Sequence, residues 1–373
     1  MATNLPFELV EDILRRLPVK SLKRFRSVAR SWHSLIDSEP FAKSHLHRSL
    51  STASNRHLLI GLELLAVDLG RLDRAVPLRP PFCYRASDGF SNSCNGVVLA
   101  MGDPPVLYNP FSRDHRVLPS CPIEHRTPPE CYPHTVYGFG YEPIADDYKV
   151  IRVIEFRHEG SYAWVSSEAR VYSLRSNCWR RIEDFPYPLP FLNCFWRVHV
   201  SGSLHTLVLD PRESDGGKIM AFSVQTEKHS SMKLPPGVQM WDSHVVLYVL
   251  DSCLSVVHRK KYSKIDIWVM KEYGSSESWT KVVAVGPPAI DRLDFLSPLV
   301  YSPDGDKVLL SCNDFKLVWF DSKEKSVSDV NVQGLPYRFY AEVCVESLIR
   351  LSEQGKETKK KIRRKREKKG KKR

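Results

Sequence analysis

The sequence predicts a protein of mixed class, with a short helical module at the N-terminus followed by an all-β domain built as a β-propeller of about six blades. Three observations lead to this prediction. The first fifty residues show helical spacing of apolar residues, the next three hundred repeat a pattern of short strands, and the last eighteen are rich in Lys and Arg. We therefore expect a helical module over residues 1–50, a propeller over 51–352 and a disordered basic tail over 353–373.

Apolar residues of the N-terminal module recur every three to four positions, as on one face of an amphipathic helix. A first helix is predicted from about Pro6 to Arg16. Pro18 cannot continue that helix, but it suits the first turn of a second one, Val19 to Val28. Two further short helical segments are expected around Trp32 and around Phe41. So small a module buries little apolar surface and should need a partner surface. The inward-facing residues expected in the second helix are Leu22, Phe25 and Val28.

The order of residues in this module closely resembles the F-box motif over about 45 residues, in the run Leu5 to Pro18 and then in Val19 to Val28 and Ser31 to Ile36. The resemblance implies docking onto the Skp-type adaptor of an SCF ubiquitin ligase and, through it, onto a cullin. One such leucine alone would more often be ordinary core packing, but the whole ordered string favours docking. Trp32 is expected to pack in the module's own core. The adaptor-facing positions that the resemblance implies are Leu5, Pro6, Ile13, Leu14, Leu17, Pro18 and Leu22.

Residues 55–350 repeat one pattern at least five times: an apolar strand, a polar turn and a second short strand. Most of these hairpins follow a further apolar strand, so a repeat holds three to four strands, as a propeller blade does. Five marker residues, one in each repeat, are 64, 49, 47 and 51 residues apart. A period near fifty is typical of kelch-type blades, and about 305 residues then make six of them. The markers are Tyr108, Tyr172, Ala221, Trp268 and Trp319.

The two ends of the repeat region each hold a strand pattern without an obvious neighbour. Residues His57 to Leu69 look like strands that lack partners, and Tyr340 to Leu348 alternates like a strand at the far end. If both segments belong to one blade, they close the ring. We therefore predict a blade shared between the beginning and the end of the propeller.

Two segments of the body resemble the plant F-box-associated domain: Tyr137–Tyr141 before Asp146–Val150, and Trp268–Tyr273 before Ser278–Val282. Together with the F-box motif, the resemblance spans about 350 residues. Within that family the chain is most similar to the constitutive-expresser-of-pathogenesis-related-genes (CPR) branch. This similarity implies a role in restraining plant defence by turnover of immune components, with an immune receptor or another defence-related protein as the target.

Charge and cysteine content limit the classes of protein to which the folded part of this chain could belong. The net charge is +12, but Lys356–Arg373 holds thirteen Lys/Arg and two Glu, so the rest of the chain is close to charge balance. The nine cysteines are odd in number and never spaced as C-x-x-C, which fits reduced thiols better than disulfides or zinc. No run approaches eighteen apolar residues and no signal pattern opens the chain, so we expect a soluble intracellular protein without a transmembrane segment.

Three groups of residues could suggest chemistry, and each has a simpler explanation. Asp146 and Asp147 sit where a turn enters a strand, and Ser302–Asp306 has the composition of a tight turn rather than a calcium loop. His45 and His47 lack a third ligand nearby and are expected on the surface. No phosphate-binding glycine loop or nucleophile elbow is present. We therefore expect no catalytic residue, metal, cofactor or small-molecule substrate, and hence not an enzyme.

Without a nucleophile or base of its own, the protein would act by proximity. It would hold a target protein beside a ligase-bound ubiquitin conjugate and so raise its effective concentration. Long loops between blades are the expected target-binding face of a propeller. Three segments are long enough to form this face: Pro128–Tyr132, Phe185–Pro188 and Pro211–Gly217.

The basic tail lacks apolar periodicity and is expected to be disordered in isolation. The most specific function that we predict for the tail is that of a nuclear-import signal, and the protein is then expected in the nucleus and cytoplasm. Contact with nucleic acid or with an anionic membrane stays open, and a nucleic-acid-associated binding protein that acts through the tail is the alternative function. The candidate import residues are Lys359, Lys360, Lys361, Arg363, Arg364, Lys365 and Arg366.

Overall fold

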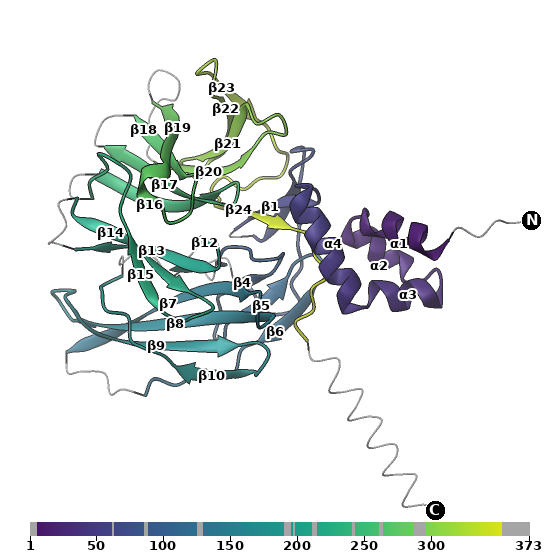
Figure 1. The fold of residues 1–373 in the computed structure, drawn as a ribbon, viewed down its shortest axis with the longest axis horizontal. Helices are drawn as coiled ribbons and strands as arrows, with labels where there is room; N and C mark the ends of the chain where they lie inside the picture. The colour runs from purple at the N-terminus through teal and green to yellow at the C-terminus, as the bar shows by residue number, and fades with distance from the viewer. Residues whose placement is uncertain are drawn as a thin grey trace, which may run out of the picture.

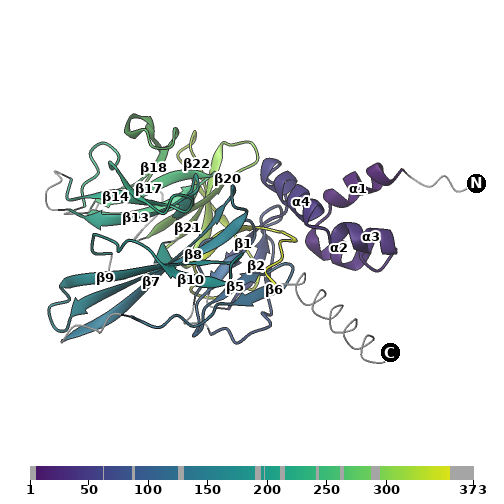
Figure 2. The same cartoon turned by 60° about the horizontal axis from the view of Figure 1, so that its bottom comes forward.

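The computed structural model describes residues 6–61, 63–85, 89–124, 130–189, 195–196, 198–210, 215–240, 243–260, 264–286 and 295–352. Within these residues four short helices lie beside a ring of six β-sheets, and a second view shows the helices on the same side of the ring (Figures 1 and 2). The predicted fold class, a helical module followed by a six-bladed propeller, is confirmed. The basic tail, 353–373, and Leu5 lie outside the described residues. None of the described helices is long and apolar enough to span a membrane.

The helical module consists of α1 (Phe7–Arg15), α2 (Val19–Phe25), α3 (Arg30–Ile36) and α4 (Glu39–Ser51). Prolines precede α1 and α2, at a position where their missing N–H costs no helical hydrogen bond. Ser38 caps α4, since its hydroxyl oxygen accepts a hydrogen bond from the N–H two residues into the helix, at 3.3 Å. These starts agree with the predicted helices.

A small apolar core holds the four helices together, formed by Leu14, Val19, Leu22, Ile36 and Phe41, all nearly inaccessible to solvent. Trp32 packs edge-on against Phe25, with ring centroids 5.8 Å apart, and so belongs to this core as predicted. The expectation that Val28 faces inward was wrong. The second helix ends at Phe25, three residues earlier than predicted, and Val28 is 62% exposed in the turn that follows.

The strands of the six blades pair antiparallel, except that Phe195–Trp196 pairs parallel with Tyr137–Gly138, and all five predicted hairpins are present. The first blades along the chain are β4–β6 (Val98–Ala100, Val106–Asn109, Asp114–Val117), β7–β10 (Cys131–Glu142, Asp147–His158, Trp164–Ser173, Cys178–Arg181) joined by β11 (Phe195–Trp196), and β12–β15 (Val198–Val200, Ser203–Leu209, Gly217–Ser223, His229–Met232). The next are β16–β19 (Ser243–Leu250, Cys253–Lys260, Ile265–Met270, Trp279–Val285), with a short 3-10 helix at Ser276–Ser278, and β20–β23 (Leu296–Tyr301, Lys307–Cys312, Lys316–Asp321, Val327–Val330).

The last blade closes the ring with strands from both ends of the propeller, as predicted. Strand β24 (Ala341–Val345) pairs antiparallel with β1 (Arg56–Ile60), which pairs in turn with β2 (Leu65–Asp68) and β3 (Ala75–Pro77). The pairing of β24 with β1 joins the two ends of the propeller through backbone hydrogen bonds. It also brings the beginning and the end of the propeller together beside α4 (Figure 1).

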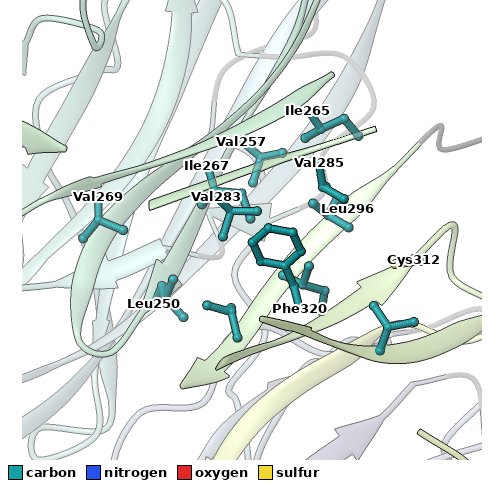
Figure 3. Close-up of a cluster of buried hydrophobic side chains, with 13 residues drawn as sticks. Leu250, Val257, Ile265, Ile267, Val269, Val283, Val285, Leu296, Cys312 and Phe320 are labelled. Atoms are coloured by element: carbon teal, nitrogen blue, oxygen red, sulfur yellow. The ribbon is translucent and has the colours of Figure 1, made fainter. Parts of the chain in front are cut away.

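Apolar side chains fill the space between neighbouring blades. Figure 3 shows one such cluster, where Val257, Ile267 and Val283 of one blade meet Leu296 and Phe320 of the next. Each of these five side chains is at most 2% exposed except Val257, at 5%. Burying aliphatic and aromatic side chains in this way stabilises the fold by about 1.5–3 kcal/mol for each. The blades therefore support one another around the ring and present a rigid platform.

Candidate functional site

The outer side of the helical module carries exposed apolar side chains. Phe7, Leu9 and Ile13 of α1 are 47%, 52% and 49% exposed. Leu9 and Ile13 are four residues apart and share one helical face. Pro6 and Pro18, at the starts of the first two helices, are exposed as well. A cluster of exposed apolar side chains on so small a module is suited to bind a partner surface.

The seven predicted adaptor-facing residues divide into four groups. Pro6, Ile13 and Pro18 lie on the surface, Leu17 is half-buried, and Leu5 lies outside the described residues. Leu14 and Leu22, by contrast, are 1% and 0% exposed and pack in the core of the module. These two side chains have no free surface to offer a partner in this conformation, so their part in docking would be indirect, by holding the helices in place. Phe7 and Leu9 were missed, although the helical period places Leu9 beside Ile13.

The module is anchored to the propeller by the segment that follows β24, residues 346–352, which we call the strap. Glu346 is buried, and its carboxylate accepts a hydrogen bond of 2.6 Å from the backbone N–H of Val19 at the start of α2. Two residues later, Leu348 inserts into the apolar core of the helices. The end of the propeller thus completes a core that begins at the N-terminus.

Burial shifts the pKa values of two titratable groups at this junction, those of Glu346 and His57. Burial raises the pKa of the Glu346 carboxyl to about 7, while the N–H of Val19 opposes part of that rise. Burial also lowers the pKa of His57, whose Nε2 lies 3.6 Å from Oε1 of Glu346. Because burial disfavours the charged form of both groups, the contact between them is not a strong ion pair.

Blade β4–β6 holds the strap from the other side. The amide of Asn109, which is fully buried, donates hydrogen bonds to the carbonyl oxygens of Ser347 and Ile349 at 3.0 and 3.1 Å. The N–H of Leu351 donates to Asp114 at 2.7 Å. Arg350 forms an ion pair of 2.8 Å with Asp37, next to α3. The strap therefore contacts the helices and the propeller at once.

Two further contacts join the module to the ring. The Lys43 ammonium of α4 lies 2.5 Å from a carboxylate oxygen of Asp146, in the turn between β7 and β8, and Lys23 donates to the carbonyl of Ser112. The Asp146 carboxylate also accepts a hydrogen bond from the Tyr141 hydroxyl, and these two donors lower its pKa. Asp147 accepts from the Ser173 hydroxyl and the Arg175 N–H. Asp146 thus joins the turn to the helical module, and Asp147 fixes the turn within its own blade, in keeping with the prediction that both are turn residues.

A channel with a volume of about 880 Å³ lies between the inner strands of the ring. One end is bordered by Leu50, Ala53 and Arg56, where α4 meets the propeller, and another part by Met240 and Asp314. This volume is within the range of sites that bind small molecules or side chains. The channel offers space in which a ligand or a segment of a target could be held.

Burial keeps three of the titratable groups that line the channel neutral, those of His199, His205 and Cys94. Burial lowers the pKa values of His199 and His205 to about 4. Burial also raises the pKa of the Cys94 thiol to about 12. Nδ1 of His199 lies 3.8 Å from the sulfur of that thiol. A thiol of this kind is a poor nucleophile at neutral pH, because the reactive species is the thiolate.

One of the histidine expectations was wrong. His47 is exposed as predicted, but His45 is completely buried, and its Nε2 lies 2.9 Å from the carbonyl oxygen of Leu17. Burial lowers the pKa of His45, so the ring is neutral and donates to that carbonyl. The side chain ties α4 to the end of α1, which no spacing rule indicates. Among the described residues there is no group of three or more His, Cys, Asp or Glu that could hold a metal ion.

The remaining candidate segments are placed as follows. Ser302–Asp306 forms a tight turn, in which the N–H of Gly305 donates to the carbonyl of Ser302 at 2.8 Å. Phe185, predicted in a target-binding loop, is 1% exposed and packs against Trp196 with ring centroids 5.0 Å apart. That part of the loop prediction was wrong, because the aromatic ring is needed between two blades. Parts of the other two predicted loops, 128–129 and 211–214, lie outside the described residues.

Comparison with known proteins gives matches over both parts of the chain. A model of the F-box domain matches residues 3–44, and a model of the F-box associated beta propeller domain matches residues 84–351. The chain is 33% identical to F-box protein CPR1 of Arabidopsis thaliana over 94% of this chain and 89% of that protein. It is 30% identical to F-box/kelch-repeat protein At3g23880 of the same plant, over 82% and 85% of the two chains.

Among solved structures, an oligogalacturonate lyase in complex with manganese aligns with a TM-score of 0.42 and 11% identity, over 75% of this chain and 74% of that one. The sequence matches are far more specific. They cover the four helices and most of the propeller, and they include a relative of the CPR type that the sequence resembles. The chain belongs to the family of F-box proteins that carry an F-box-associated β-propeller domain.

Proposed function

We propose that this protein is the substrate-recognition subunit of an SCF ubiquitin ligase. The helical module would dock onto a Skp-type adaptor and, through it, onto a cullin, while the propeller binds a target protein for ubiquitination and degradation by the proteasome. The observation that carries the proposal is the exposed apolar surface of α1, around Leu9 and Ile13, on a module whose core is otherwise complete. An apolar surface of this kind is explained by a partner.

The chemistry of transfer would come from other subunits. In the described part of the channel, the Cys94 thiol lies 3.8 Å from His199, but burial raises its pKa to about 12, so it stays protonated and is a poor nucleophile at neutral pH. The protein would contribute by holding the target in a fixed position relative to the ubiquitin conjugate, which raises the effective concentration of the reacting groups. The strap supports this proposal, because it fixes the module against the propeller.

A binding titration with a purified Skp-type adaptor tests the proposal. Ile13→Ala is expected to weaken binding by about 2 kcal/mol, or about thirtyfold, as interface anchors do. Leu9→Ala should act in the same direction. Ile144→Ala is the matched control, because Ile144 is 76% exposed but lies in the turn between β7 and β8 of the propeller. Equal affinity of all four proteins for the adaptor would refute docking through this face.

The cellular role and location are proposed on the resemblance and on the basic tail. The resemblance to the CPR branch supports a target among immune receptors or other defence-related proteins. The run of basic residues between Lys359 and Arg366 supports nuclear import, and with it a protein of the nucleus and cytoplasm. Deletion of 353–373 should then move a fluorescent fusion of the chain from the nucleus to the cytoplasm. An unchanged distribution would argue against import.

Binding of nucleic acid through the tail is a second candidate, favoured by the +11 charge of Lys356–Arg373. Each phosphate neutralised by the tail should add about 0.9 to the slope of log affinity against log salt. Measurement of binding to double-stranded DNA at several salt concentrations, with and without residues 353–373, distinguishes this candidate. Weak binding that does not change on deletion of the tail would count against it.

A further inference from the structure

A small cavity lies at the junction between the helical module and the propeller. Its volume is about 190 Å³, which gives room for several water molecules. It is bordered by the ends of α2 and α3, the turn between β5 and β6, and the strap. We call it the junction cavity. The residues that line it are Arg26, Ile36, Asp37, Ser112, Arg113, Asp114, Leu348 and Arg350.

Positive side chains outnumber negative ones at the junction cavity. Three guanidinium groups and two carboxylates line it. The ammonium of Lys23 adds a fourth positive charge at the edge of the cavity, where it donates to the carbonyl oxygen of Ser112. Four positive charges against two negative ones leave a net charge of +2. The negative ends of α2 and α3 oppose this excess by about half a charge each at most, so the site stays positive.

The two carboxylates do not neutralise the excess, because each is already engaged. One oxygen of Asp37 pairs with Arg26 at 2.6 Å and the other with Arg350 at 2.8 Å, so a single negative charge serves two guanidinium groups. The oxygens of Asp114 accept hydrogen bonds from backbone N–H groups of the strap and of β6. In the described part of the chain, neither carboxylate forms an ion pair with the two remaining positive groups.

Several donors at the cavity have no acceptor. Within the described residues, the buried Nε of Arg26 has no hydrogen-bond partner, and the side chain of Arg113 forms neither a hydrogen bond nor an ion pair. Lys23 uses one of its three N–H donors on Ser112. Burial and then the positive charges of Arg26 and Arg113 lower the pKa of Lys23. A negatively charged acceptor would satisfy these donors and relieve the repulsion among them.

We infer that the junction cavity binds a phosphate group, either as the free anion or as part of a phosphate monoester. A monoester carries a charge of about −1.5 to −2 at pH 7, which balances the positive excess, and three strong acceptor oxygens. Lys23 and Arg26 would hold it from the end of α2, and Arg113 would hold it from the propeller. The bound phosphate would connect the helical module to the ring beside the strap and so stabilise that connection. The inference is independent of the ligase proposal, because it concerns a contact within the chain.

Isothermal titration calorimetry with the full chain tests the inference. Sodium phosphate and glycerol 3-phosphate are titrated separately at constant ionic strength, and at least one of them should bind with saturation. Arg113→Asn and Lys23→Gln should each weaken that binding at least tenfold. Asparagine suits position 113, where φ is 61°, and glutamine at position 23 can still donate to the carbonyl of Ser112.

Arg24→Gln is the matched control, because Arg24 is exposed on the same helix and does not line the cavity. This variant should bind phosphate as the unaltered chain does. All four proteins carry the same basic tail, so any binding of phosphate to the tail contributes equally to each. Hydrogen exchange measured by mass spectrometry should slow in α2 and in residues 109–114 when phosphate is added, and should stay unchanged in β16–β19.

The two ligands distinguish the sources of the phosphate group. Binding of phosphate but not of glycerol 3-phosphate supports the free anion as the ligand, whereas binding of glycerol 3-phosphate supports a monoester. Three results would overturn the inference. They are no saturable binding of either ligand, equal affinity of the Arg113 and Lys23 variants and the control, and slower exchange confined to other blades.

Discussion

At the scale of single residues, neighbouring positions on α1 have opposite roles. Leu14 is 1% exposed in the core of the helices, whereas Ile13 is 49% exposed beside it. The resemblance to the F-box motif assigns both residues to adaptor docking, because the motif shows which positions are apolar but not which way their side chains face. The two roles can be separated by measuring stability and binding on the same proteins.

Leu14→Ala is expected to lower the free energy of unfolding by about 2–5 kcal/mol, because it leaves a cavity in the small core of the module. Ile13→Ala should change it by no more than about 0.5 kcal/mol, as exposed substitutions usually do. Chemical unfolding followed by circular dichroism at the helical signal measures both. A stable Leu14→Ala protein would show that the core described for the helices is incomplete.

The carboxyl of Glu346 predicts a dependence of stability on pH. Burial raises its pKa to about 7 from the ordinary value of 4.5, so the folded protein binds more protons than the unfolded chain between these two pH values. The contribution of Glu346 to stability is therefore fully present below about pH 4.5 and is lost as the pH rises through 7, by up to about 3 kcal/mol. His57 has the opposite effect, because burial lowers its pKa. Its contribution to stability is therefore lost as the pH falls.

Glu346→Gln separates these two effects, because an uncharged amide can still accept the hydrogen bond from Val19. Compared with the unaltered protein, this variant should lose less stability between pH 5 and 7.5. Thermal unfolding across that range provides the measurement. Parallel pH profiles for the two proteins would mean that Glu346 ionises as freely when folded as when unfolded.

At the scale of elements, the β-hairpins followed from the sequence and the strap did not. Strands such as Ile265–Met270 and Lys316–Asp321 were found because alternating apolar residues and turn residues are local signals. The strap depends on contacts such as that of Asn109 with Ser347, 238 residues apart, which no local pattern records. His45 and Phe185 were misplaced for the same reason, since tertiary packing decided their burial.

Asn109→Ala should loosen the strap, since it leaves the carbonyl oxygens of Ser347 and Ile349 buried without this donor. A cost of about 1–3 kcal/mol is expected. Hydrogen exchange measured by mass spectrometry should show faster exchange in residues 346–352 and in α2, and unchanged exchange in β16–β19. Asn331→Ala, at an exposed position after β23, is the control. Exchange that stays the same at the strap would show that Asn109 does not hold it.

At the scale of the whole molecule, the strap connects the apolar face of the helical module to the propeller that encloses the channel. The apolar face of α1 lies on the module, the channel passes through the ring, and the strap fixes one against the other. The six-bladed ring could be predicted from its period of about fifty residues, and the shared closing blade from its two unpaired ends. The channel lining could not, because it combines side chains from strands across the whole propeller.

The central claim is that this chain brings a target to a cullin through a Skp-type adaptor. The most direct measurement is reconstitution from purified chain, adaptor and cullin, followed by size-exclusion chromatography with light scattering. We expect the chain, adaptor and cullin to form one complex, and the chain and cullin to form none without the adaptor. The double substitution Leu9→Ala/Ile13→Ala should abolish the ternary complex. Failure of the intact chain to join adaptor and cullin, or a ternary complex unaffected by that double substitution, would contradict it.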